Sequence, residues 1–128
     1  MSSTYDVVAG VEARGFIFAS AVAQLTGKGF VPIRKSGKLP YQSYSHSYAL
    51  EYGEATLQIH TDALKPGERV LLIDDVLATG GTLGAATVLI EKCGAVVDSV
   101  AVLLEIEGLG GRENFISHGS KVPITVLI

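Results

Sequence analysis

Short apolar runs rich in β-branched residues alternate along the chain with longer segments whose apolar residues recur every three or four positions. Runs of the first kind are typical of buried strands, and segments of the second kind are typical of helices that pack through one face. Most of these segments end in glycine or in a small polar cluster. The alternation predicts an α/β fold in which helices flank a mostly parallel sheet.

The same pattern predicts where the elements lie. Strands are expected at 5–10, 29–34, 69–74, 96–105 and 122–128. One helix is expected at 15–27, a second follows residue 82 and ends at residue 93, and a short helical turn is expected at 110–115. In the first helix, Phe16, Ala19 and Val22 or Ala23 are expected to face the core. Residues 46–52 and 54–60 alternate in polarity on either side of Gly53, which predicts an antiparallel hairpin beside the parallel sheet. Residues 34–44 have no apolar period and predict a long loop.

Length and composition limit the class of protein. With 128 residues, 48% hydrophobic and 18% charged, the chain is expected to form one domain, residues 1–128, with a filled core. The longest weakly polar stretch, 15–25, is shorter than the roughly 20 residues that a membrane helix needs. Residues 1–5 have no basic region followed by an apolar one, which argues against a secretory signal. A cytoplasmic protein without a membrane partner is therefore expected.

Charge and metal-ligating residues exclude further classes. The net charge of -3 offers no basic face for nucleic acid, so a nucleic-acid partner is not expected. Cys93 is the single cysteine, which rules out an intrachain disulfide and a thiolate cluster within one chain. His46, His60 and His118 lie far apart without ligand spacing, so no structural metal is expected.

The most informative segment is 70–82, where the most apolar strand leads into Asp74 and Asp75 and then into a Thr-Gly-Gly-Thr turn. Open α/β sheets bind ligands at the carboxyl ends of their strands, and a helix N-terminus favours a phosphate. Carboxylates suit the vicinal hydroxyls of a ribose. The two acids together with the turn at the helix N-terminus therefore predict a site for a phosphorylated sugar. The alternative is that both acids cap the helix and the glycines only form a tight turn.

This segment resembles the phosphoribosyl-pyrophosphate (PRPP) motif of the type I phosphoribosyltransferase family. The resemblance implies that Asp74 and Asp75 bind the ribose hydroxyls and lie near Mg²⁺, which reaches the site with PRPP and has no direct protein ligand. It also implies a core of this family's fold with an antiparallel flexible-loop hairpin. The residues that it assigns to the 5'-phosphate are Ala78, Thr79, Gly80, Gly81 and Thr82.

A second motif lies between the first strand and the first helix, where Glu12, Ala13, Arg14 and Gly15 follow Gly10-Val11. Taken alone, it predicts an ordinary βα turn with a solvated Arg14. In the resembling family the equivalent loop binds pyrophosphate, often through a non-proline cis peptide that falls at Glu12-Ala13 here. The resemblance therefore places the backbone amides and Arg14 against pyrophosphate.

A third motif runs from the basic residues Arg34, Lys35 and Lys38 to the segment Leu50-Glu51-Tyr52-Gly53. Taken alone, it predicts a solvated basic loop that enters a hairpin. With the other two motifs it resembles the adenine phosphoribosyltransferase family, in which a flexible loop closes over PRPP and excludes water. The resemblance implies that the basic residues bind pyrophosphate, and it assigns catalytic roles to Arg34, Glu51 and Tyr52, with Glu51 handling a proton of the purine ring.

The implied activity is purine salvage, in which adenine and PRPP give AMP and pyrophosphate on a Mg²⁺-dependent homodimer. A non-catalytic PRPP or nucleotide-binding module, an inactive core and transfer to another purine or pyrimidine remain alternatives. The resemblance runs from about Tyr5 to the C-terminus, whereas family members carry a further N-terminal segment that forms a hood over the purine. We therefore expect adenine recognition to be impaired or supplied by another element or subunit, and exposed apolar surface to promote self-association.

Overall fold

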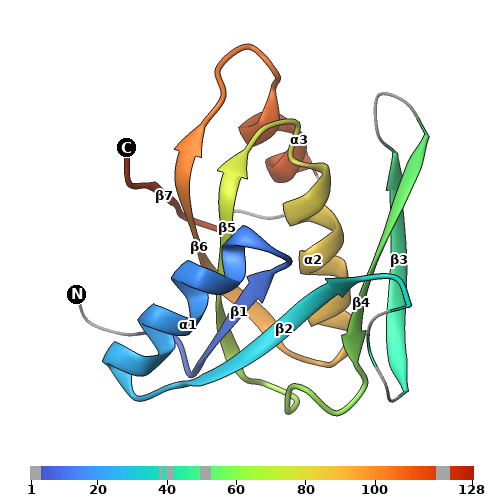
Figure 1. Cartoon of the computed structure of the whole chain (residues 1–128), viewed down its shortest axis with the longest axis vertical. Helices are drawn as coiled ribbons and strands as arrows, with labels where there is room; N and C mark the ends of the chain where they lie inside the picture. The colour runs from blue at the N-terminus through green and yellow to red at the C-terminus, as the bar shows by residue number, and fades with distance from the viewer. Residues whose placement is uncertain (1–3, 38, 40–41, 50–52, 118–121) are drawn as a thin grey trace.

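A computed structural model describes residues 4–37, 39, 42–49, 53–117 and 122–128. Within these residues, seven strands form one sheet in the order β3-β4-β2-β1-β5-β6-β7 (Figure 1). The helices are α1 (Arg14–Thr26), α2 (Gly81–Lys92) and α3 (Gly111–Ser117). The strands are β1 (Val7–Val11), β2 (Gly29–Lys35), β3 (Ser43–Ala49), β4 (Glu54–His60), β5 (Arg69–Leu77), β6 (Val96–Glu105) and β7 (Ile124–Val126). The predicted α/β class is confirmed.

Five neighbouring strands run parallel, in the order β2, β1, β5, β6 and β7. Helices cover both faces at the centre of this parallel part of the sheet. On one face, Leu71 and Ile73 of β5 pack with Ala19 and Ala23 of α1. On the other face, the core includes Leu72 together with residues of α2. Because both faces are covered, β5 is a nearly continuous apolar run rather than an alternating one.

The predicted hairpin is confirmed by the antiparallel pairing of β3 with β4, from Ser43 opposite His60 to Ala49 opposite Glu54. Strand β4 joins the edge of the parallel sheet through antiparallel pairs with Arg34 and Lys35 of β2. Figure 1 shows the hairpin standing beside α2. The hairpin therefore packs beside α2, and Tyr48 of β3 contacts the first turn of this helix.

Several predicted boundaries were wrong by a few residues. Strand β5 continues to Leu77, beyond the predicted end at 74, because β6 pairs alongside it as far as Glu105. Strand β7 is shorter than the predicted 122–128, because pairing with β6 is limited to Val100–Val102. Strand β3 begins at Ser43, so the predicted loop 34–44 is shorter. The predicted end of the first hairpin strand, 50–52, lies outside the described residues.

The buried face of α1 consists of Gly15, Ala19 and Ala23, whereas Phe16 and Val22 are only partly buried, so this prediction was correct in part. Small residues face the sheet because the helix lies very close to it: a Cβ added at Gly10 would lie 2.6 Å from the Ala19 Cβ. The helix ends at Gly27 as predicted, with a φ of 68° that favours glycine. None of the helices among the described residues is long and apolar enough to cross a membrane.

Candidate functional site

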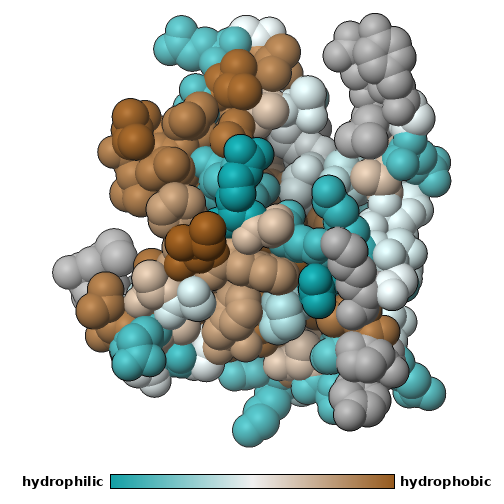
Figure 2. All heavy atoms as spheres, viewed as in Figure 1, coloured by the Kyte–Doolittle hydropathy of each residue, from teal (hydrophilic) through white to brown (hydrophobic). Residues whose placement is uncertain are grey.

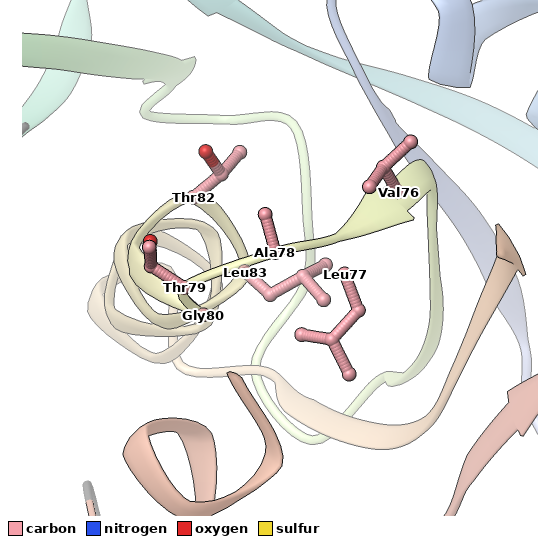
Figure 3. Close-up of a pocket in the computed structure, with 7 residues that line it drawn as sticks. All are labelled: Val76, Leu77, Ala78, Thr79, Gly80, Thr82 and Leu83. Carbon is pink, nitrogen blue, oxygen red and sulfur yellow. The ribbon is translucent and has the colours of Figure 1, made fainter. Parts of the chain in front are cut away.

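The residues after β5 form a small cradle at the N-terminus of α2. A hollow of about 50 Å³ is lined by Val76, Leu77, Ala78, Thr79, Gly80, Thr82 and Leu83. In Figure 3, Ala78 and Thr82 point to one side of this loop, while Leu77 and Leu83 point to the other. Leu77 and Leu83 are buried, so they form the apolar support on which the loop rests. Four of the five residues that the family resemblance assigns to a 5'-phosphate line this hollow, namely Ala78, Thr79, Gly80 and Thr82, while Gly81 follows Gly80 in the chain.

The first turn of α2 has the electrostatics of an anion site. Its N-cap is Gly80, whose φ of 87° is a conformation that side chains disfavour, and the closest approach of a side chain to the first amides is the long 3.5 Å hydrogen bond from the Gly81 N–H to Thr79 Oγ1. The first amides of a helix have no intrahelical acceptor, and they carry the positive end of the helix dipole. No acidic residue lies in this first turn. The alternative in which Asp74 and Asp75 cap the helix is therefore wrong, and the amides are available to a phosphate.

Helix α3 supports the cradle from behind, which the sequence analysis missed. The Asn114 side-chain amide donates a hydrogen bond of 2.7 Å to the Thr79 carbonyl oxygen. A Cβ added at Gly80 would lie 2.6 Å from the Gly111 carbonyl oxygen, and one added at Gly111 would overlap the Ala78 carbonyl oxygen. The two backbones therefore touch directly. No local pattern signals this contact, because Asn114 and Thr79 are 35 positions apart.

The two adjacent acids at the end of β5 have different environments. Asp75 keeps 15% of its side chain exposed and forms an ion pair with Arg14, with 2.7 Å between Oδ2 and Nε. Asp74 is buried, and its Oδ1 accepts a hydrogen bond of 2.8 Å from the Asp75 backbone N–H. Burial raises the pKa of Asp74 to about 7, and the neighbouring Asp75 charge adds to the rise. Asp75 is thus the acid that is open to a ligand.

The loop after β1 contains the cis peptide between Glu12 and Ala13 that the family resemblance implies. The Glu12 carboxylate, 7% exposed, accepts a 2.9 Å hydrogen bond from the Lys35 backbone N–H and lies 3.3 Å from Arg34 Nε. Arg34 also lies over the Phe16 ring, with 5.9 Å from Cζ to the centroid. Glu12 therefore fixes the end of β2 and Arg34 with its side chain, so only its backbone is left to bind an anion.

The parallel register brings the end of β1 beside the ends of both β2 and β5. The carboxyl ends of these strands therefore bring together five predicted site residues: Arg14 and Gly15 after β1, Arg34 and Lys35 at the end of β2, and Asp75 on β5. Gly15 is buried, and a Cβ there would lie 3.0 Å from the Ile73 carbonyl oxygen, so α1 starts in close contact with β5. The remaining predicted site residues, Lys38, Glu51 and Tyr52, lie outside the described residues.

The family model for the phosphoribosyl transferase domain matches residues 2–122. The chain belongs to this phosphoribosyltransferase family. Its curated relatives include the adenine phosphoribosyltransferase of Nocardioides sp., which is 58% identical over 96% of this chain and 64% of the relative. Another is the adenine phosphoribosyltransferase of Chlorobium luteolum, 55% identical over 92% of this chain and 67% of the relative. The chain thus spans about two thirds of the length of these relatives.

Solved structures agree with this assignment. The phosphoribosyltransferase fold described above matches the crystal structure of adenine phosphoribosyltransferase from Thermoanaerobacter pseudethanolicus with a TM-score of 0.91 and 45% identity, covering 99% of this chain and 72% of that one. The enzyme from Saccharomyces cerevisiae, solved with an imino-altritol bisphosphate and adenine, gives a TM-score of 0.91 at 35% identity, covering 99% and 69%. The type I phosphoribosyltransferase fold predicted from the sequence is confirmed.

Proposed function

We propose that this chain is an adenine phosphoribosyltransferase that converts adenine and PRPP to AMP and pyrophosphate. The observation that carries the proposal is the position of the anion cradle directly after the Asp75–Arg14 pair. We assign the turn to the 5'-phosphate, the Asp75 carboxylate to the ribose and the Arg14 cation to pyrophosphate, which is the order in which PRPP presents the three groups. Relatives at 53–58% identity that are named adenine phosphoribosyltransferases support adenine as the acceptor.

Each group of the site has a role in this reaction. The amides and hydroxyls of residues 78–82 hold the 5'-phosphate, and Asp75, assisted by Asp74, accepts hydrogen bonds from the ribose hydroxyls. Arg14 and Arg34, with Lys35 and Lys38, neutralise pyrophosphate. The bond between C1' and the pyrophosphate oxygen breaks, and the bond between C1' and adenine N9 forms. Because charge separates in this step, electrostatic stabilisation supplies much of the rate.

Glu51 and Tyr52 are proposed to act on the base. As N9 bonds to C1', adenine must lose one ring proton, and a carboxylate at position 51 accepts a proton of the ring. General acid–base catalysis of this kind contributes about 10²–10⁴-fold. The role of Tyr52 rests on the same family resemblance, next to Glu51 in the sequence.

The donor set fits a magnesium ion that arrives with the substrate. Mg²⁺ is usually bound through one or two carboxylates together with substrate phosphates and water. Among the described residues, no cluster of three or more potential ligands exists, so the ion is proposed to be carried by PRPP and to lie near the partly exposed Asp75 carboxylate without a direct protein ligand. When bound, Mg²⁺ adds positive charge at the leaving pyrophosphate.

A cytoplasmic homodimer completes the proposal. The buried free thiol of Cys93 suits a reducing compartment. Figure 2 shows hydrophobic residues gathered on the side where β6, β7 and the C-terminus lie. Leu25 and Leu127 are 86% and 63% exposed there, beside an apolar hollow. A surface of this kind favours association of two copies. Sedimentation at micromolar concentration is expected to show a dimer, and a monomer would contradict it.

The decisive experiment for the activity measures AMP formed from adenine, PRPP and Mg²⁺, with a parallel sample that lacks the metal. AMP that appears only with the metal supports the proposed transferase. PRPP binding without AMP would replace it with a non-catalytic binding module. If neither binding nor turnover occurs, the functional assignment fails.

A further inference from the structure

A tyrosine of the hairpin lies directly against the phosphate cradle. The Thr82 hydroxyl donates a hydrogen bond of 3.2 Å to the Tyr48 phenol oxygen. The ring covers the preceding residue as well, because a Cβ added at Gly81 would lie 3.1 Å from Tyr48 Cδ2. Tyr48 comes from β3 and Thr82 from the first turn of α2, 34 positions later in the sequence. One side chain therefore connects the hairpin to two residues assigned to the 5'-phosphate.

The rest of the hairpin holds Tyr48 in this place. The Lys92 ammonium group at the other end of α2 donates a 3.1 Å hydrogen bond to the Ser45 carbonyl oxygen. Tyr48 is partly buried and packs on the larger core cluster. Tyr44, four positions earlier on the same strand, is 37% exposed. Two tyrosines of one strand thus occupy different environments, and Tyr48 is the one hydrogen-bonded to Thr82.

We propose that Tyr48 is a positioning residue for the phosphate cradle and acts through Thr82. This inference rests on the proposed function, because it requires that the cradle hold the 5'-phosphate. A phosphate dianion offers acceptor oxygens, so Thr82 must turn its proton toward the phosphate when the ligand binds. The Tyr48 O–H then donates a hydrogen bond to Thr82 Oγ1. This bond strengthens the hydrogen bond that the Thr82 hydroxyl donates to the phosphate. The phenol therefore changes from acceptor to donor on binding.

The hydrogen bond between Tyr48 and Thr82 also connects the phosphate cradle to the hairpin. Tyr48 precedes Glu51, the residue proposed to handle the purine proton, by three positions. Phosphate binding and the position of Tyr48 on β3 are therefore linked through one hydrogen bond. Loss of the bond is expected to weaken binding of any ligand that carries the 5'-phosphate, and to leave the pyrophosphate contacts of Arg14 and Arg34 unchanged.

The test uses Tyr48→Phe, which keeps the ring over Gly81 and removes only the phenol oxygen. Calorimetric titration with ribose 5-phosphate is expected to give a Kd about three- to tenfold higher than for the wild type, as for the loss of one hydrogen bond. The KM for PRPP is expected to rise by a similar factor, while kcat changes less. Tyr44→Phe is the matched control, since it removes the same atom from the same strand away from Thr82, and it is expected to bind as the wild type does.

A double-mutant cycle with Thr82→Val separates positioning from general packing. If Tyr48 acts through the Thr82 hydroxyl, Tyr48→Phe has no further effect on the Kd in the Thr82→Val background. An additive loss, or an unchanged Kd for Tyr48→Phe alone, would overturn the inference and leave the proposed function intact. If the wild type binds neither ribose 5-phosphate nor PRPP, the proposed function fails and the inference fails with it.

Discussion

The Arg14 guanidinium lies 2.7 Å from the Asp75 carboxylate and so joins the first turn of α1 to the end of β5. The two groups are assigned to opposite parts of PRPP, the cation to pyrophosphate and the acid to ribose. Arg14 has 79% of its side chain exposed, so the pair contributes little to stability. The pair brings together the two groups that we propose to bind PRPP, and the exposure of Arg14 leaves room for its side chain to turn toward pyrophosphate.

Replacement of this cation is expected to separate pyrophosphate binding from phosphate binding. Arg14→Gln is expected to raise the Kd for PRPP about tenfold or more, because a charge-assisted contact to the leaving group is lost. The Kd for ribose 5-phosphate, which has no pyrophosphate, is expected to change less than the Kd for PRPP. Calorimetric titration with each ligand measures both effects.

Arg69→Gln is the matched control, because Arg69 also forms an ion pair with an aspartate, Asp6, near the start of β5. Both ligands are expected to bind this variant as they bind the wild type. An equal loss of PRPP affinity in the two variants would show that Arg14 acts through general charge and not as a pyrophosphate ligand.

The raised pKa of Asp74 makes the stability of the fold depend on pH. A carboxyl with a pKa of about 7 when folded and about 4 when unfolded binds more protons in the folded state between these values. The free energy of unfolding therefore decreases as pH rises from 4 to 7, by an amount on the order of a few kcal/mol, and levels off above this range. Urea denaturation at a series of pH values measures the slope.

Asp74→Asn removes the titrating group and is expected to make the contribution of this position independent of pH. The variant is therefore expected to gain stability relative to the wild type as pH rises from about 4 to about 7. Asp62→Asn, which removes an exposed carboxyl, serves as the control and is expected to keep the wild-type slope. Parallel pH profiles for wild type and Asp74→Asn would contradict the assignment of this slope to burial of Asp74.

The contact between α3 and the cradle predicts a phosphate-binding defect from a substitution outside the cradle. Gly111→Ala places a Cβ against the Ala78 carbonyl oxygen and is expected to displace the loop. The Kd for ribose 5-phosphate is expected to rise, although alanine is intrinsically favoured over glycine in a helix by roughly 1 kcal/mol. Gly29→Ala is the control, because a Cβ there makes only an ordinary 3.8 Å contact with Val7. Equal binding by both variants would exclude α3 as a support of the cradle.

Glu51 is tested through the rate of the chemical step. Glu51→Gln removes the proton acceptor and is expected to lower kcat about 10²–10⁴-fold while the Kd for PRPP stays nearly unchanged. Glu54→Gln, an exposed carboxyl at the start of β4, is the control and is expected to keep full activity. An unaltered kcat for Glu51→Gln would remove Glu51 from the mechanism.

Local patterns predicted most of the fold, while the roles of the site residues stay predictions. The apolar run before Asp74 and the Thr-Gly-Gly-Thr turn predict a strand, a tight turn and a helix in this order, because each has a short-range signal. Gly53 and the alternation around it likewise predict the hairpin. These features depend on neighbours in sequence, and the structure confirms them as elements.

The parts that could not be predicted depend on contacts between distant residues. Adjacent aspartates look alike in the sequence, yet Asp74 is buried against the start of α1 while Asp75 meets Arg14. The use of Glu12 to hold Arg34 follows from the pairing of β1 with β2, and the support of Thr79 by Asn114 from the packing of α3. A sequence pattern gives no distance between such residues, so these roles required the structure.

We propose that the first turn of α2 holds the 5'-phosphate while the acids at the end of β5 hold the ribose. A crystal structure of the chain with Mg²⁺ and PRPP tests it most directly. The 5'-phosphate is expected within hydrogen-bonding distance of the amides of Gly80, Gly81 and Thr82, with a ribose hydroxyl on Asp75. A phosphate bound elsewhere, or a ribose that touches neither Asp74 nor Asp75, would contradict it.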